Sequence, residues 1–120
     1  MKTGRKITGG KYHRNRKKRL HELDKQTRMV KLGEDKRKAL KVRGGCKQVM
    51  LSSNSVNLYN SKTKKSKKVK IKNVLETPSN KFLARQNILV KGAIIDTESG
   101  KARITNRPSQ EGSVQAILIE

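Results

Sequence analysis

The side chains that could support covalent or metal chemistry are few: two histidines, His13 and His21, and one cysteine, Cys46. Both histidines lie in or beside a strongly basic stretch, whose charges disfavour the imidazolium form. Cys46 follows Gly44-Gly45, and basic neighbours favour a thiolate there, but no ordered base accompanies it. The three residues lack zinc-ligand spacing, and a single cysteine forms no intramolecular disulfide. We therefore expect no enzyme, no metal and no cofactor.

The glycine pairs, Gly9-Gly10 and Gly44-Gly45, do not form a nucleotide-binding loop. Neither lies in G-x-x-x-x-G-K-[ST], nor in G-x-G-x-x-G between a strand and a helix. Thr8-Gly9-Gly10-Lys11 does allow backbone N–H groups to approach a phosphate closely, although the bare motif is weak. No small-molecule substrate is expected.

Positive charge is the dominant property of the chain. Among 120 residues, 31 Lys and Arg face 9 Asp and Glu, a net charge of +22. Residues 1–47 carry +14, residues 48–120 carry +8, and residues 1–19 hold nine basic residues without an acid. Self-repulsion on this scale opposes a compact state and indicates a polyanionic partner. The alternative for residues 1–19 is a solvated tail without a binding role. We expect residues 1–19 to be disordered alone.

The basic residues form two dense clusters, at 14–19 and at 62–72. Lysine serves phosphate as a mobile point charge, and arginine adds a bidentate fork. The residues predicted to bind the phosphates of this partner are Lys2, Arg5, Lys6, Lys11, Arg14, Arg16, Lys17, Lys18, Arg19, Arg43, Lys62, Lys64, Lys65, Lys67, Lys68, Lys70 and Arg107.

The scarcity of aromatic residues narrows the class of partner. Only Tyr12, Tyr59 and Phe82 are present, and there is no Trp. Binders of single strands stack bases on aromatic platforms, and the RRM signature is missing, so recognition of shape and phosphates on folded RNA fits better. DNA-wrapping proteins usually dimerise through long helices, which this sequence does not offer. A membrane partner needs an apolar helix face or a span of roughly 20 apolar residues, and neither is found.

Short segments rich in β-branched residues alternate with Gly, Pro and Asn turns. We predict an all-β fold, a small closed β-barrel with an extended basic N-terminal arm. The arm is assigned to residues 1–21 and the barrel domain to 22–120, with 20–35 irregular. The expected strands are 36–43, 47–53, 56–59, 68–72, 88–90, 93–97, 101–105 and 114–119, with a short helix at 81–86. The predicted core lies in residues 42–120 and includes Val49, Leu51, Leu58, Val69, Ile71, Ile94, Ile104, Val114, Ile117 and Ile119.

Several segments together resemble one known family. Arg5-Lys6-Ile7-Thr8-Gly9-Gly10 is similar to the opening of the archaeal and eukaryotic small-subunit ribosomal protein S8e family, and Val42-Arg43-Gly44-Gly45 to its central hairpin. Residues 69–80 resemble its core strand, and Lys91-Gly92-Ala93-Ile94-Ile95 and Thr105-Asn106-Arg107-Pro108 its closing stretch. The short length resembles archaeal members.

The resemblance implies a compact β-barrel with an extended N-terminal arm and a structural role on small-subunit ribosomal RNA. Neighbouring ribosomal proteins are the implied further partners, and the cytoplasmic ribosome the implied location. A ribosome-assembly factor that binds pre-ribosomal RNA is the alternative. A nucleoid-type DNA-binding protein is a third possibility and an enzyme a distant fourth.

Overall fold

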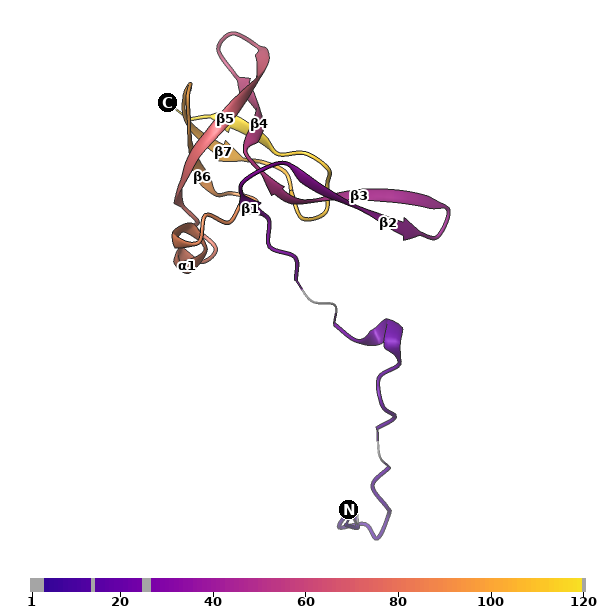
Figure 1. Cartoon of the computed structure of the whole chain (residues 1–120). Helices are drawn as coiled ribbons and strands as arrows, with labels where there is room; N and C mark the ends of the chain where they lie inside the picture. Colours follow the sequence, from indigo (N-terminus) through magenta and orange to yellow (C-terminus); the bar gives the residue numbers. More distant parts are fainter. Residues whose placement is uncertain (1–3, 14, 25–26, 120) are drawn as a thin grey trace.

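A closed barrel of five strands forms the body of the protein (Figure 1). The structure, a computed structural model, describes residues 4–13, 15–24 and 27–119. Strands β4 and β8 pair in parallel and close the barrel, and all other neighbours are antiparallel. In barrel order the strands are β4 (Ser55–Asn60), β5 (Lys65–Glu76), β6 (Ile94–Thr97), β7 (Gly100–Ile104) and β8 (Gln115–Leu118). The prediction of a small closed β-barrel is therefore confirmed.

A second, three-stranded sheet lies beside the barrel. It consists of β1 (Lys31–Leu32), β2 (Lys36–Val42) and β3 (Gly45–Ser53) in the order β1-β3-β2. Strands β2 and β3 form the predicted hairpin, whose turn uses a left-handed φ of 90° at Gly44. The prediction that the barrel core begins at Val42 was wrong, because Val42 is 50% exposed and the first barrel strand begins at Ser55.

The core is built from aliphatic side chains. It includes Val30, Met50, Val56, Leu58, Ile71, Val74, Leu89, Ala93, Ile95, Ala102, Ile104, Val114 and Ala116. Among the predicted core residues, five are buried and two half-buried: Val49, Leu58, Ile71, Ile104 and Val114, then Val69 and Ile94.

Three predicted core residues, Leu51, Ile117 and Ile119, are exposed instead, at 38–39%. The period of two along a strand explains the error at Ile117 and Ile119. In β8, Ala116 points inward, so Ile117 faces outward. In β3 the alternation breaks: Val49 and Met50 are both buried, and Leu51 lies at an irregularity in the pairing with β2, where Lys36 pairs with Ser52 and Arg37 with Met50.

The connection from β5 to β6 contains the one α-helix of the described chain. Helix α1 (Lys81–Arg85) confirms the predicted short helix, and the side chain of Asn80 caps it by accepting the N–H of Phe82. The predicted strand at 88–90 was wrong. Ile88 forms only an isolated bridge with Lys31, and the Leu89 N–H donates to the Val30 carbonyl at 2.8 Å. These backbone bonds join the segment to the chain before the barrel rather than to a barrel strand.

The described residues before β1 contain little regular structure. Among them is one 3-10 turn, η1 (Leu20–Glu22), and in Figure 1 this part of the chain leads away from the barrel. Among the described residues, no helix has the length and apolar character needed to cross a bilayer.

The two faces of the barrel wall give a matched stability test. Ile71→Ala removes a buried side chain and should lower the free energy of unfolding by about 2–5 kcal/mol. Ile117→Ala makes the same change on the outer face, and we expect a cost below about 1 kcal/mol. Denaturant titrations of both variants measure this. Equal costs would show that the inward and outward faces have been misassigned.

Candidate nucleic-acid interface

The first candidate cations are gathered on a tight turn. The Lys6 N–H donates to the Gly10 carbonyl at 2.8 Å, and Arg5 and Lys11 face each other across an isolated antiparallel bridge. Gly9 has a φ of 83°, a conformation that favours glycine. The ammonium of Lys6 lies 5.6 Å from the centroid of the Tyr12 ring, within cation–π distance. Lys2 lies outside the described residues.

The next cluster is organised by one carboxylate. Arg16 donates from both terminal nitrogens to Glu22, at 2.8 Å to Oε2 and 2.5 Å to Oε1. The Arg19 N–H also donates to Glu22 Oε2, at 3.0 Å. The Arg16 guanidinium and the Arg19 N–H lower the pKa of Glu22, and the bond to Glu22 raises the pKa of Arg16. The Arg16 guanidinium already forms an ion pair with Glu22, so a phosphate would have to compete with the Glu22 carboxylate for its N–H donors.

Three neighbours of Arg16, namely Lys17, Lys18 and Arg19, have exposed side chains. They present their charges to solvent and are better placed than Arg16 to meet a phosphate. Arg14 lies outside the described residues.

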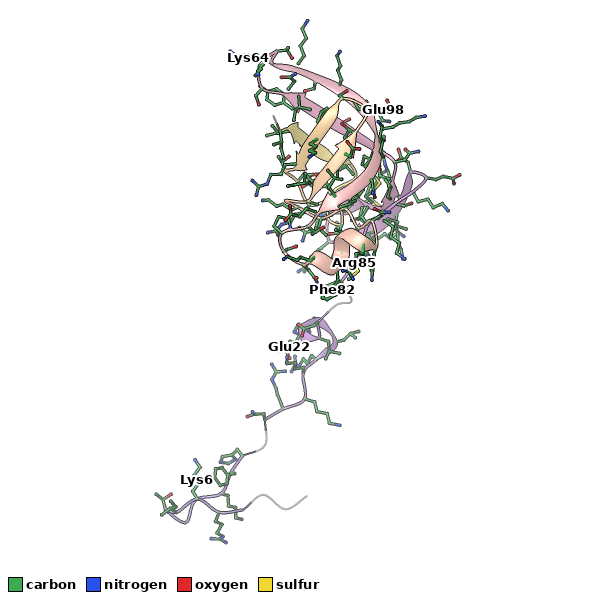
Figure 2. All side chains as sticks on the ribbon, turned by 90° about the vertical axis from the view of Figure 1, so that its left-hand side faces the viewer. Lys6, Glu22, Lys64, Phe82, Arg85 and Glu98 are labelled. Atoms are coloured by element: carbon green, nitrogen blue, oxygen red, sulfur yellow. The ribbon has the colours of Figure 1, made fainter. Side chains whose placement is uncertain are left out.

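The second dense cluster occupies the β4–β5 loop and the start of β5. The Asn60 side chain fixes the loop by accepting the N–H groups of Lys62 and Thr63, and Lys64 takes a left-handed φ of 51°. Figure 2 shows Lys64 at one end of the barrel. Lys65 and Lys67 line a hollow of about 360 Å³ at this end, together with Leu58 and Leu118.

Lys68 and Lys70 lie farther along β5 and have acidic neighbours. They share a hollow with Asp35 and Glu98, and Lys68 helps to lower the pKa of Asp35. Both lysines therefore lie near carboxylates of the protein itself.

The remaining predicted residues, Arg43 and Arg107, lie in different places. Arg43 is exposed in the turn of the β2–β3 hairpin. Arg107 is exposed in the loop after β7, whose carbonyls at Pro108 and Glu111 accept the N–H of Met50 in β3. That loop supports the base of the hairpin.

A third basic surface lies on the β2–β3 hairpin, which projects from the barrel in Figure 1. We call residues 36–47 the basic hairpin. All twelve except Leu40 are exposed, and the segment contains no acid. Its cations are Lys36, Arg37, Lys38, Lys41, Arg43 and Lys47. Because both faces of this part of the ribbon lie in solvent, its surface is available for a partner.

Asp35 fixes the hairpin at the point where the chain enters the barrel. Its Oδ1 accepts the Ser53 hydroxyl at 2.7 Å and the Asn54 N–H at 3.0 Å, and its Oδ2 accepts the Ser55 hydroxyl at 3.1 Å. These hydrogen bonds, the one from Ser53 foremost, lower the pKa of Asp35. One carboxylate thus bridges the start of β2 and the β3–β4 junction.

Comparison with known proteins identifies the family. The family model for ribosomal protein S8e matches residues 1–119. The chain belongs to the ribosomal protein S8e family. It is accordingly a structural ribosomal protein and not an enzyme.

Curated relatives agree with this assignment over almost their whole length. Each of the following is named small ribosomal subunit protein eS8. The Methanocella arvoryzae protein is 46% identical over 98% of this chain and 95% of its own. The proteins of Nanoarchaeum equitans and Sulfurisphaera tokodaii are 44% and 45% identical, each over 97% of this chain and 92% of their own.

The basic hairpin of this S8e protein was largely missed by the sequence analysis, which selected only Arg43 from it. The available signal was the absence of any acid between Lys36 and Lys47. It was overlooked because the cations are separated by Ala39, Leu40 and Val42, which resemble an alternating barrel strand. The structure places these apolar residues outside the barrel.

The Asp35 joint predicts a pH-dependent difference in stability. Asp35→Asn removes the charge that the two hydroxyls and one N–H stabilise. It should cost about 1–2 kcal/mol at neutral pH, since solvent screening of this exposed carboxylate reduces the usual energy of bonds to a charged acceptor. Because the folded-state pKa is lowered, this contribution is present above about pH 4 and is lost as the pH falls through the lowered value. Thermal unfolding of both proteins from pH 7 to pH 2 measures the difference. A cost that stays constant down to pH 2 would contradict the role of the carboxylate charge.

Proposed function

We propose that this protein is a structural constituent of the small ribosomal subunit that binds ribosomal RNA through phosphate-backbone contacts. It acts in the cytoplasm as part of the ribosome, beside neighbouring ribosomal proteins. The observation that carries the RNA-binding proposal is the location of the charge. The densest groups of cations lie on the N-terminal segment, the basic hairpin and the β4–β5 loop, all of which extend from the barrel.

We assign different tasks to the parts of the chain. Residues 1–21 act as an RNA-binding arm that becomes ordered on its partner, and residues 22–120 form the domain that contains the barrel. Within that domain the basic hairpin and the β4–β5 loop supply further phosphate contacts. In the arm, Lys17, Lys18 and Arg19 contribute more than Arg16, because Glu22 already neutralises Arg16.

Salt dependence tests the arm. Replacing Arg16, Lys17, Lys18 and Arg19 together with Ala should flatten the slope of log affinity against log salt by about two to three units, since each phosphate contact contributes about 0.7–0.9. Titrations on small-subunit ribosomal RNA at several salt concentrations measure the slope, with a scrambled RNA for comparison. An unchanged slope would reject the arm as a main phosphate-binding element. A loss of discrimination without a change in slope would indicate base reading instead.

The basic hairpin has its own test. Lys38→Gln, Lys41→Gln and Lys47→Gln together should also flatten the slope by about two units or more. The matched control replaces three exposed lysines of the barrel, Lys72, Lys91 and Lys101, with Gln, which changes the net charge equally. The proposal predicts a larger effect for the hairpin variant than for the control. Equal effects would mean that only total charge matters.

Retention on ribosomes separates a constituent from an assembly factor. A constituent should remain with mature small subunits through a high-salt wash, whereas a transient factor should be found only on precursor particles. Quantification of the protein across a sucrose gradient distinguishes the two.

A further inference from the structure

Helix α1 exposes an aromatic ring that the fold does not need. Phe82 is 68% exposed, whereas Leu83 and Ala84 are half-buried against the body and Ala84 packs on the core. The helix is held by its Asn80 cap and by the Ile88 N–H, which donates to the Leu83 carbonyl at 3.1 Å. The inward face of the helix is thus complete without Phe82.

None of the three aromatic residues of the chain is buried. Tyr12 is 54% exposed, Tyr59 39% and Phe82 68%, while the core is aliphatic. A tyrosine hydroxyl can be solvated, but a phenylalanine ring has no polar atom. Single apolar side chains are common at protein surfaces, so the exposure of Phe82 points to a ligand only in combination with its neighbours. Phe82 is the most exposed of the three aromatic rings and the one without a polar atom of its own.

The surroundings of Phe82 are cationic. The guanidinium carbon of Arg85 lies 5.9 Å from the centroid of the Phe82 ring, and Figure 2 shows the two side chains together at the end of the barrel opposite Lys64. An arginine plane and an aromatic ring are the two surfaces on which proteins stack unpaired RNA bases. An apolar protein partner would instead leave the charge of Arg85 without compensation.

A polar hollow of about 480 Å³ adjoins this pair. Arg85 and Lys81 of α1 line it, together with the amide side chains of Asn73 and Asn87 and the carboxylate of Glu76. Thr77 also lines it, and its buried hydroxyl has no hydrogen-bond partner among the described residues. The hollow thus combines cations for a phosphate with amides that can donate and accept hydrogen bonds.

We propose that α1 binds a single unstacked nucleotide of the ribosomal RNA. The base stacks on Phe82 and Arg85, and the adjoining phosphate contacts Lys81 at the rim of the hollow. This inference rests on the proposed RNA-binding function and adds a base contact to the phosphate contacts made elsewhere. The site lies at the opposite end of the barrel from the β4–β5 loop, so the two contacts together would fix the orientation of the barrel on the RNA.

Substitutions at Phe82 separate stacking from simple apolar contact. Binding to a protein-free transcript of the small-subunit ribosomal RNA is measured for Phe82→Trp, Phe82→Leu and Phe82→Ala. Stacking predicts that Trp retains affinity and that Leu and Ala each weaken it by about 5- to 100-fold. The salt slope should stay unchanged in all three, because no charge is altered. Lys81→Gln, by contrast, should reduce the slope by about 0.7–0.9. Thermal unfolding checks that each variant remains folded.

A second measurement locates the contact directly. After photocrosslinking to a 4-thiouridine-labelled transcript and digestion with trypsin, the peptide Phe82–Arg85 should carry a nucleotide.

The outcomes distinguish this inference from the function on which it rests. If the unmodified protein binds the transcript but Phe82→Leu and Phe82→Ala bind equally well, the nucleotide site is rejected and the proposed function stands. If those variants fail only in assembled subunits, Phe82 contacts a neighbouring protein, and the inference is likewise overturned. If the unmodified protein does not bind the transcript, both proposals fail.

Discussion

Mutual repulsion among 31 cations, balanced by only 9 carboxylates, is the constraint to which the rest of this structure responds. A small aliphatic core has to hold the chain together against it. Closing five strands into a barrel helps, because no strand edge in that sheet is left unpaired. Along β5, Val69 and Ile71 face inward while Lys68 and Lys70 face solvent. Most of the remaining charge lies on segments that do not pack against the core. The residues that stabilise the fold are thus largely different from those that carry the positive charge.

Two carboxylates, Glu22 and Asp35, hold basic elements in place. Glu22 joins Arg16 to the backbone of Arg19, and Asp35 joins the start of the basic hairpin to the barrel. Both have a lowered pKa because several donors converge on one carboxylate. These acids reduce the net charge only slightly. Their main effect is to give fixed positions to cations that would otherwise repel one another freely.

The sequence was most informative where charged and apolar residues alternate with the period of a β-strand. Lys68 to Lys72 alternates charged with β-branched residues, so its inward and outward faces could be predicted. In β8 both faces carry apolar residues, and only Gln115 indicated which side faces solvent. The division between the small sheet and the barrel could not be predicted from the sequence. The junction at Ser53–Ser55 contains neither Gly nor Pro, the residues that most strongly mark the end of a strand. Charge density located two basic clusters. Charge density could not show that Arg16 forms an ion pair with Glu22, because that pairing depends on how the chain folds back at η1.

Contacts to phosphates supply affinity but carry little information about sequence, because every nucleotide has the same phosphate. A protein that relies on them can select one site on a folded RNA only through the spacing of its cationic elements. That spacing is set by residues that need not touch RNA: Asp35 positions the hairpin, and Asn60 shapes the β4–β5 loop. A single stacked base would add a contact that also depends on one nucleotide being unpaired. Selectivity in such a protein therefore depends as much on the rigidity of the joints as on the number of lysines.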